Sequence, residues 1–118
     1  MSAKKLVKDY MTPDPISVKL PGNRSEAINK MVKNKLTGMP VVKDGKLRGF
    51  VTRKDFFDNP EEDQLALVYR KDYPSLTGDS SIEEAAELFV DEELHYIPIV
   101  EENTDHCIGI ITTADMLE

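Results

Sequence analysis

The sequence has few cysteines and no long apolar runs, so it lacks the features of disulfide-rich and membrane-spanning proteins. It has one cysteine, Cys107, so neither a disulfide framework nor a multi-cysteine zinc site is available within one chain. No stretch approaches the roughly 18 apolar residues of a membrane span, and the N-terminus has no apolar leader core. We therefore expect a cytoplasmic protein that does not enter the membrane, with Cys107 as a buried thiol.

Groups that carry catalysis are also scarce. An enzyme needs an activated nucleophile, an acid/base pair or a metal set. The sequence has only two histidines, His95 and His106, and no phosphate loop of the GxxxxGK type. Its carboxylates are spread along expected helix faces, where solvation explains them. We expect no catalytic activity and no obligatory cofactor.

Basic residues are nearly absent from the second half of the chain. Residues 61–118 hold 2 Lys and Arg against 16 Asp and Glu, whereas residues 1–60 hold 13 against 6. A basic half attracts nucleic acid, but the more strongly charged acidic half repels the same polyanion once the halves pack together. Nucleic-acid binding is thus disfavoured. The charge split indicates either two solvated surfaces or attraction between unlike halves, within one chain or between two chains.

The sequence does contain an internal repeat. A shift of 58 aligns residues 12–42 with 70–100, and a shift of 60 aligns 47–58 with 107–118. Both copies end in the pattern Gly-x-x-Thr-x-x-Asp. Its fixed residues are Gly49, Thr52 and Asp55 in the first copy, and Gly109, Thr112 and Asp115 in the second.

Each copy is predicted to form a strand and then a helix. Residues 16–20 read as the first strand, and Asn23 or Ser81 is placed to cap the helix that follows. Apolar residues recur at spacings of three and four, which predicts one buried stripe on each helix. The two stripes are Ala27, Ile28, Met31, Val32 and Leu36, and Ile82, Ala85, Ala86, Phe89, Val90 and Leu94.

Two apolar runs joined by a turn follow each helix. In the first copy, residues 39–42 and 47–52 flank Asp44-Gly45, a strong hairpin signal. A closing helix is expected after Thr52 and after Thr112. The chain therefore reads as two β-α-β-β-α motifs of the α/β (α+β) class, residues 1–57 and 67–118, joined by an acidic linker, 58–66, and packed as a pseudo-twofold pair.

Two segments carry a resemblance to a known family. Residues 36–42 with 49–55, and 94–100 with 109–115, resemble the cystathionine-β-synthase (CBS) motif, and the lead-in 7–13 is similar to that of a first motif. The resemblance covers nearly the whole chain and implies a tandem CBS pair, a stand-alone Bateman-type module similar to the CBS region of inosine monophosphate dehydrogenase. The chain has no room for the catalytic barrel of that enzyme.

The resemblance also implies a function. CBS pairs are regulatory modules that bind AMP, ADP, ATP or S-adenosylmethionine-type ligands and modulate a partner, commonly as homodimers that associate through their helices. We expect the same here. The alternative is a ligand-free dimerisation or scaffold module in which the motifs are structural remnants.

The repeated pattern has a chemistry of its own. A strand that ends in threonine, with aspartate three residues later, places a hydroxyl, backbone N–H groups and a carboxylate within one turn. The hydroxyl and the helix start suit a phosphate, the carboxylate suits ribose hydroxyls, and apolar strand ends would sandwich an adenine. The alternative is purely local, with threonine as a helix cap and aspartate favoured by the helix dipole.

The resemblance implies that each site combines the lead-in of one motif with the Thr–Asp pair of the other. Family members also reach phosphate with the two residues that precede the Pro-Val strand. The first expected site therefore contains Thr12, Pro13, Ile16, His95, Tyr96, Thr112 and Asp115. His95 either donates to a phosphate or is a plain surface residue.

The second expected site is less regular, because residues 69–74 depart from the usual lead-in. It would contain Thr37, Gly38, Thr52, Asp55 and Arg70. Arg70 and its neighbour Lys71 are the only basic residues of the acidic half, so they either contact phosphate or lie on the surface. The site that ends in Thr112 and Asp115 is the favoured one.

Overall fold

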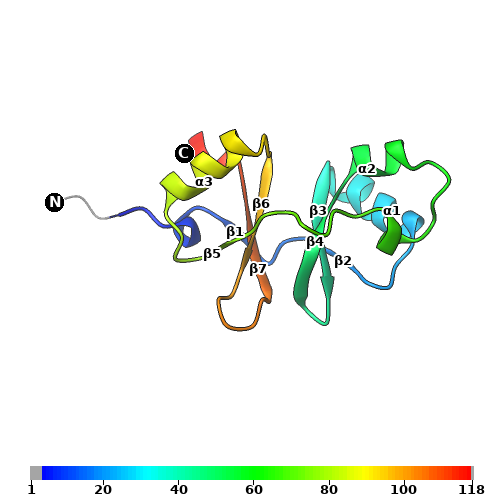
Figure 1. The fold of residues 1–118 in the computed structure, drawn as a ribbon, viewed down its shortest axis with the longest axis horizontal. Coiled ribbons are helices and arrows are strands. Elements are labelled where there is room, and N and C mark those ends of the chain that lie inside the picture. Colours follow the sequence, from blue (N-terminus) through cyan, green and yellow to red (C-terminus); the bar gives the residue numbers. More distant parts are fainter. Residues whose placement is uncertain (1–3, 118) are drawn as a thin grey trace. The chain divides into compact units, whose positions relative to one another are not determined.

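The computed structural model describes residues 4–117, which form two compact units. Unit 1 combines residues 1–15 with 74–118, and unit 2 is residues 16–73 (Figure 1). The elements of unit 1 are η1 (Val7–Asp9), β1 (Thr12–Pro13), β5 (Leu76–Thr77), α3 (Ile82–Asp91), β6 (Tyr96–Val100), β7 (Cys107–Thr112) and η3 (Asp115–Leu117). Those of unit 2 are β2 (Val18–Lys19), α1 (Arg24–Asn34), β3 (Gly38–Lys43), β4 (Lys46–Thr52), α2 (Arg53–Asp58) and η2 (Leu65–Leu67).

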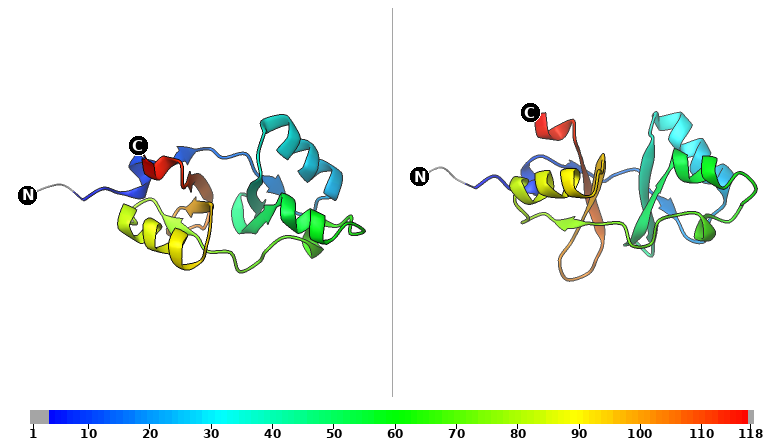
Figure 2. Two further views of the ribbon diagram at one scale, coloured as in Figure 1. Left: turned by 90° about the horizontal axis from the view of Figure 1, so that it is seen from above. Right: turned by 45° about the horizontal axis from the view of Figure 1, so that its top comes forward.

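Unit 2 is a three-stranded sheet, in the order β2-β3-β4, with α1 and α2 on one face (Figure 2). Strands β3 and β4 are antiparallel, and their turn holds Asp44 at φ 55° and Gly45 at φ 80°. Positive φ at both positions is the geometry that an Asp-Gly hairpin supplies. The hydrophobic core beneath the helices is Val18, Ala27, Met31, Met39, Val41, Val51, Phe56, Leu65 and Val68.

Unit 1 is a four-stranded sheet in the order β1-β7-β6-β5, with α3 packed beside it (Figure 1). Strand β5 runs parallel to β6, and β6 and β7 form the antiparallel hairpin of the second copy. Its core is Val7, Ala85, Phe89, Ile97, Ile99 and Ile111. The predicted mixed α/β class, with the β-α-β-β core of each copy, is thus confirmed.

The two copies exchange their lead-in segments, which is why the compact units differ from the sequence copies. Strand β1, from the start of the chain, pairs antiparallel with β7 of the second copy, with Thr12 opposite Ile110. In the same way, Arg70 forms an isolated bridge to Phe50 in β4 of the first copy. Each sheet is therefore completed by a segment that precedes the other copy.

The repeated glycine allows this exchange. A Cβ at Gly49 would overlap the carbonyl oxygen of Arg70, and a Cβ at Gly109 would lie 3.1 Å from the carbonyl oxygen of Thr12. The lead-in backbone therefore approaches β4 where a side chain has no room, and it approaches β7 closely enough to crowd an added Cβ.

Several local predictions have clear outcomes. Asn23 and Ser81 cap their helices, accepting from the N–H groups three residues on at 2.9 and 3.1 Å. The predicted burial of Val32 and Val90 is wrong, because these side chains are 63% and 75% exposed. Each follows a buried stripe residue by one position, and a rotation of about 100° per residue turns it away from the core.

The closing helices differ between the copies. The first is α2, as predicted, whereas the second is only the short 3₁₀ turn η3. Residues that were expected to act as a linker pack on the start of α1, where Arg24 N donates to the carbonyl oxygen of Asp63 at 2.8 Å. No helix within residues 4–117 is long and apolar enough to cross a membrane.

Candidate functional site

In unit 2, the Thr–Asp pair forms a closed local structure at the junction of β4 and α2. Asp55 Oδ2 accepts from the backbone N–H of Thr52 at 2.8 Å and from its hydroxyl at 3.0 Å. In return, Asp55 N donates to Thr52 Oγ1 at 3.3 Å. This reciprocal capping box satisfies N–H groups that a helix start leaves free, so the local interpretation of the pattern applies in unit 2.

In unit 1, the same pair makes the same contact at the end of β7. Asp115 Oδ2 accepts from the N–H of Thr112 at 2.8 Å and from its hydroxyl at 3.3 Å. Among residues 4–117, no hydrogen bond reaches Asp115 Oδ1, and the side chain is only partly buried. One oxygen of this carboxylate is therefore open to an external donor.

Strand register gathers further predicted residues beside each pair. Tyr96 lies opposite Thr112, and Thr12 lies opposite Ile110 two residues earlier on β7. Since side chains alternate along a strand, these residues project from the face opposite the core residue Ile111. Unit 1 thus brings together Thr12, Pro13, His95, Tyr96, Thr112 and Asp115, and unit 2 brings together Thr37, Gly38, Thr52, Asp55 and Arg70.

One of the backbone N–H groups predicted to serve a ligand already has a partner in each unit. Arg53 N donates to the carbonyl oxygen of Thr37 at 2.9 Å, and Thr113 N donates to that of His95 at 3.3 Å. These bonds hold the residues before β3 and β6 against the Thr–Asp turn. The side chain of His95 is exposed beside this turn in unit 1.

Arg70 has a partner that the sequence interpretation missed. Its Nε donates to Asp55 Oδ1 at 3.0 Å, so the guanidinium contacts the carboxylate of its own unit. Tyr73, which was not singled out, stacks on Phe50 with ring centroids 4.6 Å apart and an interplanar angle of 17°. The repeat alignment held a signal for the first contact, because the shift of 58 places Arg70 where the other copy has Thr12.

Ile16 is the one predicted site residue that falls in the other unit. It begins unit 2, and its side chain is 40% exposed. The role assigned to it beside Thr112 therefore stays a prediction.

Charge also separates the two units, although less sharply than it separates the two halves of the sequence. Unit 2 has 12 Lys and Arg against 8 Asp and Glu, whereas unit 1 has 3 against 14. The segment 74–118 contains no lysine or arginine at all. The described residues contain no group of three or more His, Cys, Asp or Glu side chains that could hold a metal ion.

The family follows from a match that covers almost the whole chain. The CBS domain model matches residues 7–62 and again residues 66–118. The chain belongs to the CBS domain family. The two matched stretches are the two copies of the repeat, so the tandem CBS pair predicted from the motifs is confirmed.

Relatives carry this CBS pair in different settings. Inosine-5'-monophosphate dehydrogenase of Methanocaldococcus jannaschii is 32% identical across 100% of the chain, which covers 24% of that enzyme. The uncharacterized protein MJ1225 of the same organism is 28% identical over 96% of the chain and 46% of its own length. The CBS domain-containing protein YhcV of Bacillus subtilis is 26% identical over 93% of the chain and 81% of its own length. The chain thus spans less than half of several curated relatives that it matches.

Solved CBS structures share the fold. CBSX2, solved in complex with AMP, superposes with a TM-score of 0.88 at 25% identity over 96% of this chain and 93% of that one. The CBS domain pair of MJ0100, solved with 5'-methylthioadenosine and S-adenosyl-L-methionine, gives a TM-score of 0.87 at 21% identity over 98% and 94%.

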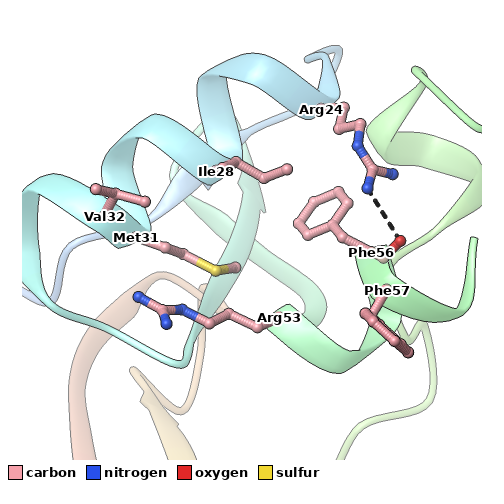
Figure 3. A pocket seen from close by; sticks show the side chains of 7 residues that line it. All are labelled: Arg24, Ile28, Met31, Val32, Arg53, Phe56 and Phe57. Carbon is pink, nitrogen blue, oxygen red and sulfur yellow. Dashed lines mark hydrogen bonds between the residues drawn. The ribbon is translucent and has the colours of Figure 1, made fainter. Parts of the chain in front are cut away.

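A second feature of unit 2 is an apolar hollow of about 310 Å³ between α1 and α2 (Figure 3). Arg24 bridges the two helices there, donating to the carbonyl oxygens of Phe56 and Asn59 at 3.1 and 2.9 Å. Val32 and Phe57 at its rim are 63% and 81% exposed. The helix side of unit 2 therefore presents apolar surface to the outside.

Proposed function

We propose that the chain is a regulatory CBS module that binds an adenosine-type ligand in unit 1. The observation that carries the proposal is the carboxylate of Asp115, which keeps one oxygen without a hydrogen bond among residues 4–117. A ribose presents two adjacent hydroxyls, and a carboxylate with an open oxygen can accept from them. The AMP complex of CBSX2, at 25% identity and nearly full coverage, supports the class of ligand.

The proposal assigns roles to the residues around Asp115. The Thr112 hydroxyl and the side chains of His95 and Tyr96 contact the phosphate or the equivalent tail of the ligand. Thr12 and Pro13, opposite Ile110 and Gly109 on β7, border the adenosine.

The charge of unit 1 ranks the candidate ligands. With 3 Lys and Arg against 14 Asp and Glu, the unit repels additional phosphates more than it attracts them. We therefore expect AMP, with one phosphate, or S-adenosylmethionine, with its sulfonium cation, to bind more tightly than ADP and ATP. Raising the ionic strength should narrow the difference, because salt screens the repulsion.

Calorimetry on protein stripped of bound nucleotide tests the binding. Titration of AMP, ADP, ATP and S-adenosylmethionine should show saturable binding of at least one ligand, and Asp115→Asn should weaken it about tenfold or more, the effect of losing a charged acceptor. The matched control is Glu102→Gln, which removes an exposed carboxylate from the β6–β7 turn of the same unit, outside α3. Absence of binding at millimolar ligand, or equal effects of the two variants, would sink the proposal.

Ligand binding can regulate a partner through thermodynamic linkage. A ligand that binds one state of the module more tightly than another shifts the population, and any partner that distinguishes those states is modulated by the same free energy.

A second candidate is self-association, as a homodimer or as a ligand-free scaffold. Exposed apolar residues stand at equivalent repeat positions: Val32 and Phe57 in unit 2, and Val90 and Leu117 in unit 1, the latter two being 75% and 88% exposed. We call the apolar pair of each unit and the charged residues beside it the helix face of that unit. The charged residues are Lys33 and Arg53 in unit 2, and Glu87 and Asp91 in unit 1. Apolar pairs repeated in this way indicate contact surfaces more than isolated surface residues do.

The surrounding charges favour contact between unlike helix faces. Lys33 and Arg53 are exposed beside the apolar pair of unit 2, whereas Glu87 and Asp91 are exposed beside Val90. The helix face of unit 2 in one copy should therefore pack against the helix face of unit 1 in a second copy.

Sedimentation at several salt concentrations tests this contact. We expect a dimer that weakens as salt rises and that Phe57→Ser dissociates. The control is Leu67→Ser, which changes another exposed apolar residue of unit 2 outside the helix face. A monomer at every salt concentration, or equal effects of the two variants, would contradict it.

A further inference from the structure

The lead-in residues Thr12 and Arg70 occupy equivalent places in the two units. Thr12 lies opposite Ile110 on β7, and Arg70 lies opposite Phe50 on β4. The second bridge is closed by two hydrogen bonds, Phe50 N to Arg70 O at 3.0 Å and Arg70 N to Phe50 O at 2.8 Å. The Cα atoms of Thr12 and Arg70 therefore occupy equivalent positions relative to the Thr–Asp pair of their own unit.

Arg70 contacts the aspartate of its unit because its side chain is longer than that of Thr12. The guanidinium of Arg70 donates through Nε to Asp55 Oδ1 at 3.0 Å, while Oδ2 of the same carboxylate is held by Thr52. Both oxygens of Asp55 are thus engaged, and its side chain is only 12% exposed. A ribose that approached Asp55 would have to displace a charged donor that is already bound.

The apolar surface of unit 2 is covered as well. Phe50 corresponds to Ile110 of unit 1, and the Tyr73 ring stacks on it at a centroid distance of 4.6 Å. Phe50 is fully buried, whereas Ile110 is only half-buried. A planar aromatic ring therefore already lies where an adenine would stack on β4.

We propose that Arg70 and Tyr73 act as a built-in substitute for the ligand in unit 2, so that the module binds one adenosine-type ligand per chain, in unit 1. Arg70 replaces the ribose hydroxyls as the donor to Asp55, and Tyr73 replaces the base on Phe50. This inference rests on the proposed function. Arg70 and Tyr73 set the stoichiometry.

Opening the unit 2 site tests the inference. Arg70→Thr gives position 70 the residue of position 12, and Tyr73→Ala removes the stacked ring. Calorimetry with AMP and S-adenosylmethionine on the full chain should give about one ligand per chain for the wild type and about two for Arg70→Thr/Tyr73→Ala, with at least a tenfold gain in affinity at the new site. Adding Asp55→Asn to the double variant should remove the gained site only.

Lys71→Thr is the matched control, because it removes a neighbouring exposed cation that lies 6.0 Å over the Tyr69 ring and not on Asp55. It should keep one ligand per chain. Circular dichroism and thermal melting must show that the double variant is folded, and Arg70→Thr alone, the milder change, should raise the occupancy of unit 2 in the same direction.

The outcomes separate the two proposals. Two ligands per wild-type chain, one of them lost in Asp55→Asn, would overturn the inference while leaving ligand binding intact. A folded double variant that still binds one ligand would do the same, as would loss of wild-type binding in Arg70→Thr. Ligand bound only by the opened variant would uphold the substitute and refute the assignment to unit 1. No binding by any variant would overturn both.

Discussion

Units 1 and 2 share the order of three equivalent strands, β7-β6-β5 and β4-β3-β2, and the same contact between threonine and aspartate, but they differ in what reaches the second oxygen of the carboxylate. In unit 2, Arg70 binds Asp55 Oδ1, whereas in unit 1 the short Thr12 stands at the equivalent place and Asp115 Oδ1 stays open. Identical motifs in the two copies thus hold carboxylates with different hydrogen-bond partners. The difference comes from a lead-in residue that lies outside the motif.

The comparison also separates two interpretations of the repeated pattern. The Thr–Asp contact is a local helix-start structure in both units, so the pattern alone indicates a capping arrangement. A carboxylate can serve a ligand only if its remaining lone pairs are free and accessible. The environment of Asp115 meets that condition, and the environment of Asp55 does not.

The largest expected effect concerns the glycine that admits each lead-in segment. Gly49→Ala would place a methyl group against the backbone carbonyl of Arg70 and 2.9 Å from the Tyr69 ring, and neither can easily retreat. At Gly109 the nearest atoms belong to the end of the flexible Met11 side chain, which can rotate away. We expect Gly49→Ala to lower the free energy of unfolding by about 2–3 kcal/mol and Gly109→Ala by about 1 kcal/mol.

Urea denaturation of the two variants and the wild type measures this difference. Equal losses would mean that the two lead-in segments approach their sheets equally closely. That result would contradict the closer approach of the lead-in to β4 than to β7.

Much of this fold could be predicted from the sequence, because the repeat doubles each local signal. Asn23 and Ser81 as caps, Asp44-Gly45 as the hairpin turn and the mixed α/β elements all follow from short-range rules. Val32 and Val90 could not be placed from spacing alone, since a residue at the edge of an apolar stripe faces the core or the solvent depending on what packs beside the helix.

The sequence predicted the candidate site only as a set of residues. The sequence indicated Thr112, Asp115 and His95 together, and the register of β6 and β7 places them side by side. The ion pair of Arg70 with Asp55 depends on the exchanged lead-in, a contact across 15 residues that no local pattern specifies. The role of Arg70 was therefore open between phosphate contact and plain surface.

The next effect in size tests the unequal carboxylates. Asp55→Ala removes the capping acceptor and the partner of Arg70, and we expect it to lower the free energy of unfolding by about 2 kcal/mol. Asp115→Ala removes only the acceptor for Thr112, and we expect a loss of about 1 kcal/mol. Thermal melting without ligand measures both variants.

A double-mutant cycle isolates the ion pair. Because the Arg70 side chain is 44% exposed, its coupling to Asp55 should be about 0.5–1 kcal/mol. The same cycle on Thr12 and Asp115 should give a coupling near zero. A coupling in unit 1 as large as that in unit 2 would remove the distinction between the two sites.

The smallest effect sharpens the comparison away from the site, at a strand position filled by Leu47 in unit 2 and by Cys107 in unit 1. Burial raises the pKa of the Cys107 thiol to about 11 from an ordinary value of 9.0, although a backbone hydrogen bond with Gly109 opposes the shift. The thiolate is the reactive form, so at pH 8 the fraction available is about 100-fold lower than for a thiol of ordinary pKa. Iodoacetamide should therefore label the folded chain slowly at pH 8, with a rate that keeps rising as the pH passes 10, and the urea-unfolded chain should label much faster.

Since this position is packed as an apolar one in both units, Cys107→Leu should change the free energy of unfolding by less than about 1.5 kcal/mol. Rapid labelling of the folded chain at pH 8 would show that the strand edge of unit 1 is open to solvent where that of unit 2 is packed.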